Sequence, residues 1–363
     1  MQLKSKQKVD SVLKILLLPF SLLYGFIISL RNFCYNTGIL KSQEYDFPVI
    51  SIGNLNVGGT GKTPHTEYVL KHLKKSFEIA SLSRGYGRKT KGYQLATAQD
   101  NANSIGDEPF QIFQKFKDVR VAVAEKRREG IKQLRKLENP PQIIVLDDAF
   151  QHRSVKPGLN ILLTDYSRLY KDDHILPSGR LREWKSGADR ADIIVVTKSP
   201  AVLSPLEIRR ISESLSPQPY QKVFFSYISY QDAKPLNRAA MSIANEKKKF
   251  ASRGVLLVSA IANPQSLKLY LNRYSKEIQN FPFKDHHYYQ AKDYENISDQ
   301  LEKLLSPKKA IVITGKDAVK FDASKFNEVP VFSIPIEIKF HEHQELSFSE
   351  EIDRYVRSYS KIS

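Results

Sequence analysis

The stretch Ser51-Ile52-Gly53-Asn54-Leu55-Asn56-Val57-Gly58-Gly59-Thr60-Gly61-Lys62-Thr63 decides the fold of this chain. The apolar run Phe47–Ile50 before it predicts a buried strand, and the apolar positions within Tyr68–Leu73 after it have helical spacing. A strand, a glycine-rich loop and a helix in this order are typical of a loop that holds phosphate groups. The stretch therefore predicts a phosphate loop at the centre of an α/β domain.

The residue types of this loop suit a nucleoside triphosphate. Its glycines allow backbone N–H groups to converge on phosphate oxygens, because no Cβ atom stands in the way. The positive end of the following helix adds to the attraction. In this pattern the lysine reaches the β- and γ-phosphates and the threonine hydroxyl holds Mg²⁺. The predicted nucleotide-binding residues are Asn56, Val57, Gly58, Gly59, Thr60, Gly61, Lys62 and Thr63.

One position departs from the usual phosphate-loop pattern, because Asn56 stands where a glycine is common. A glycine-rich turn without a ligand and a dinucleotide-binding loop are the alternatives. The ending Gly61-Lys62-Thr63 directly after a strand favours the nucleoside triphosphate.

Composition sets the broad class. A length of 363 residues, with 41% apolar and 26% charged side chains, indicates an ordinary folded protein of two or three domains. The 56 basic and 39 acidic residues give a net charge of +17, which attracts nucleic acid, anionic membranes or phosphorylated substrates. Charge alone does not choose among them. The single cysteine, Cys34, excludes an internal disulfide and fits a reducing compartment.

The N-terminal segment is the most apolar part of the chain. Ile15–Leu30 carries no charged side chain, and basic residues lie on both sides of it. As a straight helix it is about 24 Å long, shorter than the roughly 30 Å hydrocarbon core of a membrane. Arg31-Asn32-Phe33 is not the small-residue cleavage site of a signal peptide. We expect residues 1–32 to form a helix that lies in the cytoplasmic leaflet, with a membrane span and a buried soluble helix as alternatives.

Two segments after the phosphate loop carry candidate ligand-binding residues. Ser83–Lys89 follows a predicted strand, and its glycines leave room for Arg84 and Arg88 to close on a phosphate. A solvated turn is the alternative there. Asp107 precedes an apolar helix start, where a carboxylate is also a common capping residue.

The apolar strand predicted at 143–146 ends in two carboxylates, Asp147 and Asp148. A parallel strand that delivers an aspartate to the sheet edge beside a phosphate loop completes a Mg²⁺ site, because Mg²⁺ prefers hard oxygen ligands. His152 lies soon after as a candidate orienting group, with a core or capping role as the alternative. Arg127 stands in a basic helix start that opposes the helix dipole, so it is a candidate ligand or part of a solvated face.

The rest of the chain predicts more strands and a second domain. Apolar runs at 159–164 and 192–197 predict buried strands, and the loop between them holds Arg180 and Arg182. We predict an α/β fold with a P-loop NTPase-like parallel-sheet domain and a smaller α/β domain, joined by a two-stranded linker near Phe224 and 331–338. The predicted boundaries are 1–32 for the membrane-associated helix, 33–235 for the P-loop domain, 236–345 for the smaller domain with the linker strands, and 346–363 for a C-terminal helix.

Six motifs occur together and in order. They are Gly53-Asn54 with Val57–Pro64, Ser83-Arg84-Gly85-Tyr86-Gly87, Gly106-Asp107-Glu108-Pro109, Asp147-Asp148 with Phe150-Gln151-His152-Arg153, Leu176-Pro177 with Gly179 and Leu181-Arg182-Glu183, and Asp285-His286. The ordered set resembles the lipid A 4′-kinase (tetraacyldisaccharide 4′-kinase) family over nearly the whole chain. Ala149 stands where that family commonly has glycine.

The resemblance implies a reaction. The γ-phosphate of ATP, with Mg²⁺ as the partner ion, moves to the 4′-hydroxyl of an acylated glucosamine disaccharide 1-phosphate lipid. The expected product is lipid IVA, made at the cytoplasmic face of the inner membrane. Separately, we expect the protein to be a monomer.

The resemblance also assigns roles to particular residues. Asp107 matches the general base, and His286 matches the partner that orients it from the second domain. Arg127 and His152 match further active-site positions. Lys62 and Thr63 match the phosphate loop, and Asp147 and Asp148 match the Mg²⁺-associated pair. The candidates for contacts with the anionic substrate are Arg84, Arg88, His152, Arg180 and Arg182.

Two other classes of protein are alternatives to the kinase. Membrane-associated ATPase switches of the partition and division-site type have Lys-Gly-Gly-x-Gly-Lys-Thr, and Val57 replaces the first lysine here. A nucleic-acid-binding protein would need a reading helix or aromatic platforms, and only the net charge of +17 points that way. We therefore expect no nucleic-acid partner.

Overall fold

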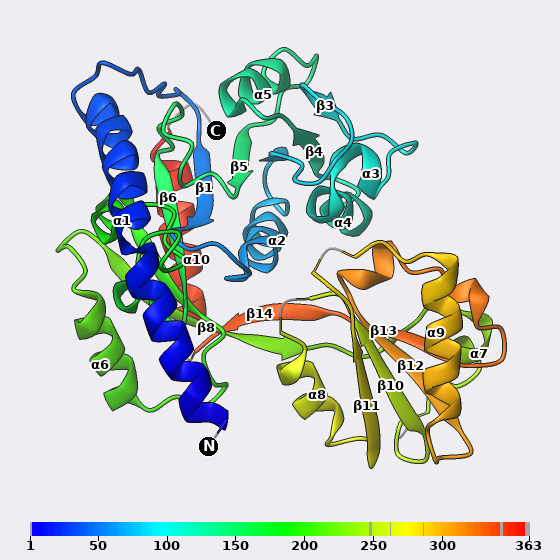
Figure 1. Ribbon diagram of the computed structural model, residues 1–363. Coiled ribbons are helices and arrows are strands. Elements are labelled where there is room, and N and C mark those ends of the chain that lie inside the picture. The colour runs from blue at the N-terminus through cyan, green and yellow to red at the C-terminus, as the bar shows by residue number, and fades with distance from the viewer. Residues whose placement is uncertain (1, 247–248, 262, 286, 342–343, 360–363) are drawn as a thin grey trace.

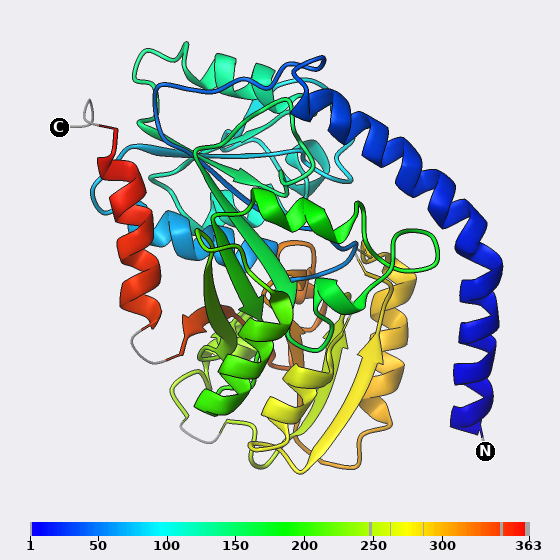
Figure 2. The same cartoon turned by 90° about the vertical axis from the view of Figure 1, so that its left-hand side faces the viewer.

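The computed structural model describes residues 2–359 except 247–248, 262, 286 and 342–343, and for residues 2–13 it describes only the helix. Figure 1 shows a larger lobe and a smaller lobe, with β8 and β14 running between them. The N-terminal helix α1 (Gln2–Asn36) lies along the outside of the larger lobe, and Figure 2 shows it at the periphery of the molecule.

Among the residues described, nine strands form the sheet of the larger lobe, in the order β14-β8-β7-β6-β1-β5-β2-β4-β3. Neighbours from β8 to β4 pair in parallel, whereas β14 and β3 pair antiparallel at the two edges. The bounds are β1 (Val49–Asn54), β2 (Ile79–Ser83), β3 (Gln94–Leu95), β4 (Arg120–Val123), β5 (Ile143–Asp147), β6 (Leu159–Asp165), β7 (Ile193–Thr197), β8 (Lys222–Tyr230) and β14 (Ile336–Phe340).

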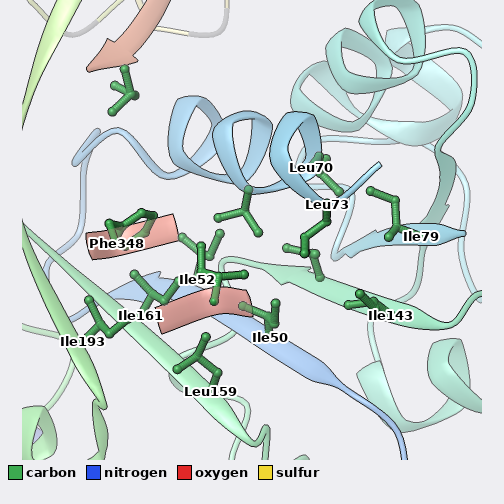
Figure 3. Close-up of a cluster of buried hydrophobic side chains, with 14 of the residues drawn as sticks. Ile50, Ile52, Leu70, Leu73, Ile79, Ile143, Leu159, Ile161, Ile193 and Phe348 are labelled. Carbon is green, nitrogen blue, oxygen red and sulfur yellow. The ribbon is translucent and has the colours of Figure 1, made fainter. Parts of the chain in front are cut away.

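Helices cover both faces of this sheet, which is why β1, β2, β5 and β7 are buried throughout. In β5, Ile143 and Val145 face one core cluster, and Ile144 and Leu146 face another. Figure 3 shows the first cluster, with α2 and α10 beside the strands. The helices of this lobe are α2 (Lys62–Leu73), α3 (Ala102–Ile105), α4 (Asp107–Lys115), α5 (Arg127–Leu134), α6 (Pro205–Leu215) and α10 (Gln344–Arg357).

The smaller lobe is built on a second sheet. In the described part of this lobe five strands occur in the order β11-β10-β12-β13-β9, parallel except for the short edge strand β9. Its elements are β9 (Lys234–Pro235), α7 (Arg238–Met241), β10 (Gly254–Ser259), α8 (Gln265–Leu271), β11 (Glu277–Pro282), α9 (Ala291–Glu302), β12 (Lys309–Thr314) and β13 (Val331–Ile334).

The two lobes are joined by an antiparallel strand pair. The pairing of β8 with β14 runs from Tyr230 opposite Ile336 to Ser226 opposite Phe340. The single strand predicted over 331–338 is wrong in detail, because Pro335 separates β13 of the smaller sheet from β14 of the larger one. The predicted α/β class, with a large parallel sheet and one N-terminal apolar helix, is confirmed.

Candidate active site

The phosphate loop lies between β1 and α2, in the middle of the larger sheet. Gly58 and Gly61 have φ angles of 109° and 87°, in the left-handed region that glycine adopts without a Cβ clash. The Asn54 Nδ2 atom donates to the Thr60 Oγ1 atom at 2.9 Å and closes the loop from inside. The strand, loop and helix predicted from the sequence are all present.

The first two residues of the loop are bound by a neighbouring loop. Asn56 is buried, and its Nδ2 atom donates to Asp173 Oδ2 at 2.9 Å. The Val57 N–H donates to the Arg180 carbonyl at 2.7 Å. Nucleotide binding by Asn56 and Val57 stays a prediction; in this structure the Asn56 amide nitrogen and the Val57 N–H are bound to protein. The neighbouring loop that carries Asp173 and Arg180 thus holds the start of the phosphate loop in place.

The two carboxylates at the end of β5 lie beside the phosphate loop, because β5 is the parallel neighbour of β1. Lys62 Nζ is 3.8 Å from Asp148 Oδ1 and 3.4 Å from Asn54 Oδ1. Asp148 has a φ of 48°, an uncommon backbone conformation for a residue with a side chain, and such residues cluster at functional sites. This geometry brings Lys62 and Asp148 together, as the sequence predicts.

The two carboxylates have opposite pKa shifts. Burial raises the pKa of Asp147 to about 6, and the negative charge of Asp148 adds to the rise. Burial acts in the same direction on Asp148, but Lys62 and Arg182 outweigh it and hold the pKa of Asp148 below its ordinary value. Thr66 Oγ1 donates to Asp147 Oδ1 at 3.0 Å. Asp148 is therefore the more firmly ionised member of the pair.

Arg127 lies behind the carboxylates. Its side chain is fully buried and donates to the carbonyl oxygens of Ala124 at 2.8 Å, Asp147 at 3.2 Å and Asp148 at 3.5 Å. Burial lowers the pKa of Arg127 to about 10, so it remains a cation at neutral pH. These contacts make Arg127 a support for the backbone of the acidic pair.

His152 lies within electrostatic range of the same cluster. Burial lowers the pKa of His152 to about 4, and the charges of Arg127 and Arg84 add to the shift. A neutral imidazole is therefore the form at physiological pH. Arg84, at the end of β2, is exposed.

The other predicted substrate arginines have different surroundings. The Arg88 side chain is only 2% exposed and pairs with Glu125 Oε1 at 2.5 Å, and its role as a substrate contact stays a prediction. Arg182 Nη1 donates to Asp148 Oδ1 at 3.0 Å, at the edge of the site. The backbone of Arg180 is bound to Val57 and Asp173, and Arg180 is exposed.

Asp107 lies at the start of α4, where the smaller lobe meets the larger one. Lys320 Nζ is 2.8 Å from Asp107 Oδ2, and both side chains are almost inaccessible, at 3% and 2% exposure. The Tyr288 hydroxyl donates to Asp107 Oδ1 at 3.1 Å. Burial raises the pKa of Tyr288 to about 12, and the negative charge of Asp107 adds to the rise. His286, the predicted partner of Asp107, lies outside the described residues.

Several contacts of this site were not predicted from the sequence. Lys320 and Tyr288 come from the other lobe, and no local pattern distinguishes them from surface residues. Lys316 Nζ bridges Glu108 at 3.2 Å and Asp285 at 3.6 Å across the same interface. The contact of Thr66 with Asp147 has a weak indication in the sequence, because Thr66 lies one helical turn after Thr63 and can face the same side of α2.

Known proteins match this chain over nearly its whole length. The family model described as tetraacyldisaccharide-1-P 4′-kinase matches residues 13–357. A tetraacyldisaccharide 4′-kinase of Bacteroides thetaiotaomicron is 43% identical over 96% of this chain and 94% of its own. Its counterpart in Flavobacterium psychrophilum is 45% identical over 94% of this chain and 96% of its own.

A solved structure agrees with these sequence matches. The crystal structure of LpxK from Aquifex aeolicus in complex with ATP aligns with a TM-score of 0.68 and 29% identity, over 95% of this chain and 99% of that chain. The resemblance seen in the ordered motifs is confirmed. The chain belongs to the tetraacyldisaccharide-1-P 4′-kinase family.

Proposed function

We propose that this chain transfers the γ-phosphate of ATP to the 4′-hydroxyl of a tetraacyldisaccharide 1-phosphate, an acylated glucosamine disaccharide lipid, and so forms lipid IVA. Family membership supports the reaction. The observation that carries the site is the approach of Lys62 to Asp148, at 3.8 Å, where the phosphate loop meets the end of β5. Phosphoryl transfer uses a lysine that binds the phosphates and a carboxylate that holds Mg²⁺.

Asp107 is the general base in this proposal. A sugar hydroxyl is a weak nucleophile, and a carboxylate that accepts its proton during in-line transfer assists the reaction. The two Asp107 oxygens are bound to Lys320 and Tyr288 in this structure, so one of these partners gives way when the sugar hydroxyl arrives. His286 is proposed to orient the base, since its neighbour Asp285 lies at the same interface through Lys316.

The residues near the phosphate loop fit the partner ion Mg²⁺. The carboxylates of Asp147 and Asp148 and the hydroxyl of Thr63 are hard oxygen donors, which Mg²⁺ prefers. No group of three or more His, Cys, Asp or Glu side chains suited to a metal occurs in the described part of the chain, so phosphate oxygens would complete the ligand set. When bound, the ion neutralises charge on the phosphates, while Arg127 holds the backbone that carries both carboxylates.

The N-terminal helix is proposed to hold the enzyme at the cytoplasmic face of the inner membrane. Lys14–Asn36 is the one helix of the described chain that is long and apolar enough to cross a membrane. Leu16, Phe20, Leu23 and Ile27 are each more than half exposed, so burying them in lipid would be favourable. We propose a monomer as the active unit, because both lobes of one chain supply the site.

Transfer of label tests this function. Purified protein in detergent is incubated with γ-labelled ATP and tetraacyldisaccharide 1-phosphate, and the products are separated by thin-layer chromatography. We expect label on the lipid, none with Lys62→Ala, and normal transfer with Lys71→Ala, which changes an exposed lysine of the same helix paired with Glu337. ATP hydrolysis without labelled lipid would instead indicate the ATPase-switch class.

The same assay tests the base. Asp107→Ala should abolish transfer while ATP affinity stays within about twofold of the unchanged protein, since the carboxylate acts on the acceptor. A loss of ATP affinity of similar size to the loss of transfer would overturn the assignment of Asp107 as base.

A further inference from the structure

Three successive carbonyl groups of the phosphate loop are bound from outside the loop. The Gly59 carbonyl accepts from Lys198 Nζ, and the Thr60 carbonyl accepts from Thr197 Oγ1 at 2.9 Å. The Gly61 carbonyl accepts from His65 Nδ1 at 2.7 Å. The carbonyl and the N–H of one trans peptide unit point in opposite directions, so binding a carbonyl on one side turns the next N–H to the other side. The Gly61 carbonyl also accepts the His65 backbone N–H at 3.2 Å, so the imidazole and the first turn of α2 together orient the N–H of Lys62.

The tautomer of His65 follows from its partners. A carbonyl oxygen can only accept, so Nδ1 carries the hydrogen and donates to Gly61. The Nε2 atom is then the acceptor, and it receives the hydroxyl of Ser226 at 2.9 Å. His65 is 2% exposed and Ser226 is fully buried. Both nitrogens of this imidazole are therefore engaged, in one defined direction.

Ser226 connects the imidazole to the strand pair between the lobes. It lies in β8 opposite Phe340 of β14, and Figure 1 shows both strands running from one lobe to the other. The Ser226 carbonyl accepts from the backbone N–H of Ser199, at 3.0 Å, two residues after Thr197. The phosphate loop is thus held by α2, β7 and β8 together.

We propose that His65 is a positioning residue for nucleotide binding, which fixes the Gly61–Lys62 peptide so that its N–H faces the phosphates. This inference rests on the proposed role of the loop in holding ATP. In this role His65 touches no reacting atom. It acts by keeping the loop in its binding conformation before the nucleotide arrives, which reduces the ordering that binding requires.

Substitution of His65 by Asn and by Gln distinguishes this positioning role from a packing role. Asn places its amide nitrogen near the position of Nδ1, so it can keep the bond to Gly61. Gln reaches instead toward the position of Nε2 and loses that bond. Phe keeps an aromatic ring against Phe340, which the imidazole meets edge-on with ring centroids 6.4 Å apart, but removes both hydrogen bonds. A packing role predicts that Phe is the mildest change, and the positioning role predicts that Asn is.

The experiment compares His65→Asn, His65→Gln and His65→Phe in the full-length protein. Isothermal titration gives the dissociation constant of Mg²⁺·ADP, kinetics gives KM for ATP and for the lipid, and thermal unfolding gives Tm. His65→Phe and His65→Gln should raise the ADP dissociation constant and KM for ATP roughly tenfold, with His65→Asn within about threefold of the parent. The KM for lipid should not change in any of the three.

A matched control lies on the same helix. His72→Asn breaks a contact with Asp353, 2.7 Å away and remote from the loop, and should leave nucleotide affinity unchanged. Unchanged ADP affinity in His65→Phe, or equal losses in Asn and Gln, would overturn the inference. Lys62→Ala distinguishes failure of the His65 inference from failure of the proposed nucleotide site. If Lys62→Ala also binds ADP normally, the loop itself is not the nucleotide site.

Discussion

Asp147 is a carboxylate whose ionised form is unfavourable in the folded chain. Burial raises its pKa from 3.8 to about 6, so the folded state binds this proton more tightly than the unfolded state does. The folded state is therefore penalised as pH rises above the unfolded pKa, and the penalty is complete above pH 6. It amounts to about 2 to 3 kcal/mol by the size of the shift. Asp147→Asn should raise Tm at pH 8 in metal-free buffer by several degrees while transfer activity is lost.

Thermal unfolding at two pH values checks this prediction. At pH 4.5 the gain should shrink to about a third, because the Asp147 carboxyl is then mostly protonated in the folded parent protein. Asp118→Asn is the control, since its side chain is 75% exposed beside Lys74 and should alter Tm little at either pH. A gain of equal size at both pH values would show that ionisation of Asp147 is not the cause.

At the scale of elements, α1 exposes apolar side chains on its outer face and also supports the loop that holds Arg182 and Trp184. The Tyr24 hydroxyl donates to the Arg182 carbonyl at 2.9 Å, and Trp184 Nε1 donates to the Gly25 carbonyl at 3.1 Å. The side chain of Arg182 in turn holds Asp148. Removing residues 1–31 should release the protein from vesicles and lower kcat roughly tenfold or more, because the Arg182 loop loses its support.

Sedimentation with vesicles and kinetics in detergent separate these two effects. Removing residues 1–13 alone leaves the contacts of Tyr24 and Gly25 in place, so kcat in detergent should stay within about twofold of the full chain. If the 1–31 deletion still sediments with vesicles, the anchor lies elsewhere, and if its kcat is unchanged, α1 does not brace the loop.

The elements around the phosphate loop were predictable from local sequence because each rests on a short-range pattern. The glycines up to Gly61 predict a turn, and the apolar run 143–146 before Asp147 predicts a buried strand. The contacts of Asn56 with Asp173 and of Arg88 with Glu125 were not predictable, because the partners are distant in sequence. The local sequence indicates the element on which a side chain lies, but not which distant group that side chain contacts.

For the whole molecule, the Lys320–Asp107 pair is the closest charged contact described between the lobes. Both charges are out of water, so removing one leaves the other without compensation, which costs about 3 to 5 kcal/mol in buried pairs. Lys320→Met should therefore lower kcat by at least about tenfold, because Asp107 loses both its orientation and its counter-charge. Lys320→Arg, which keeps the charge, should recover part of the rate.

Steady-state kinetics and Tm check this prediction. Lys303→Met is the control, because Lys303 is exposed on the same lobe and should change neither kcat nor Tm. A Lys320→Met protein with normal kcat would show that the pair does not orient Asp107 for the reaction.

The strand pair β8 and β14 has a consequence for how the chain can be cut and rejoined. The smaller lobe leaves the larger sheet after Tyr230 and returns at Ile336, and these two residues are direct partners across the ladder. The lobe is therefore an insertion whose two ends emerge side by side, with β14 and α10 completing the larger core after it. A tight turn between the two strands would close them as an ordinary hairpin. The smaller lobe is, in this sense, an exchangeable cassette.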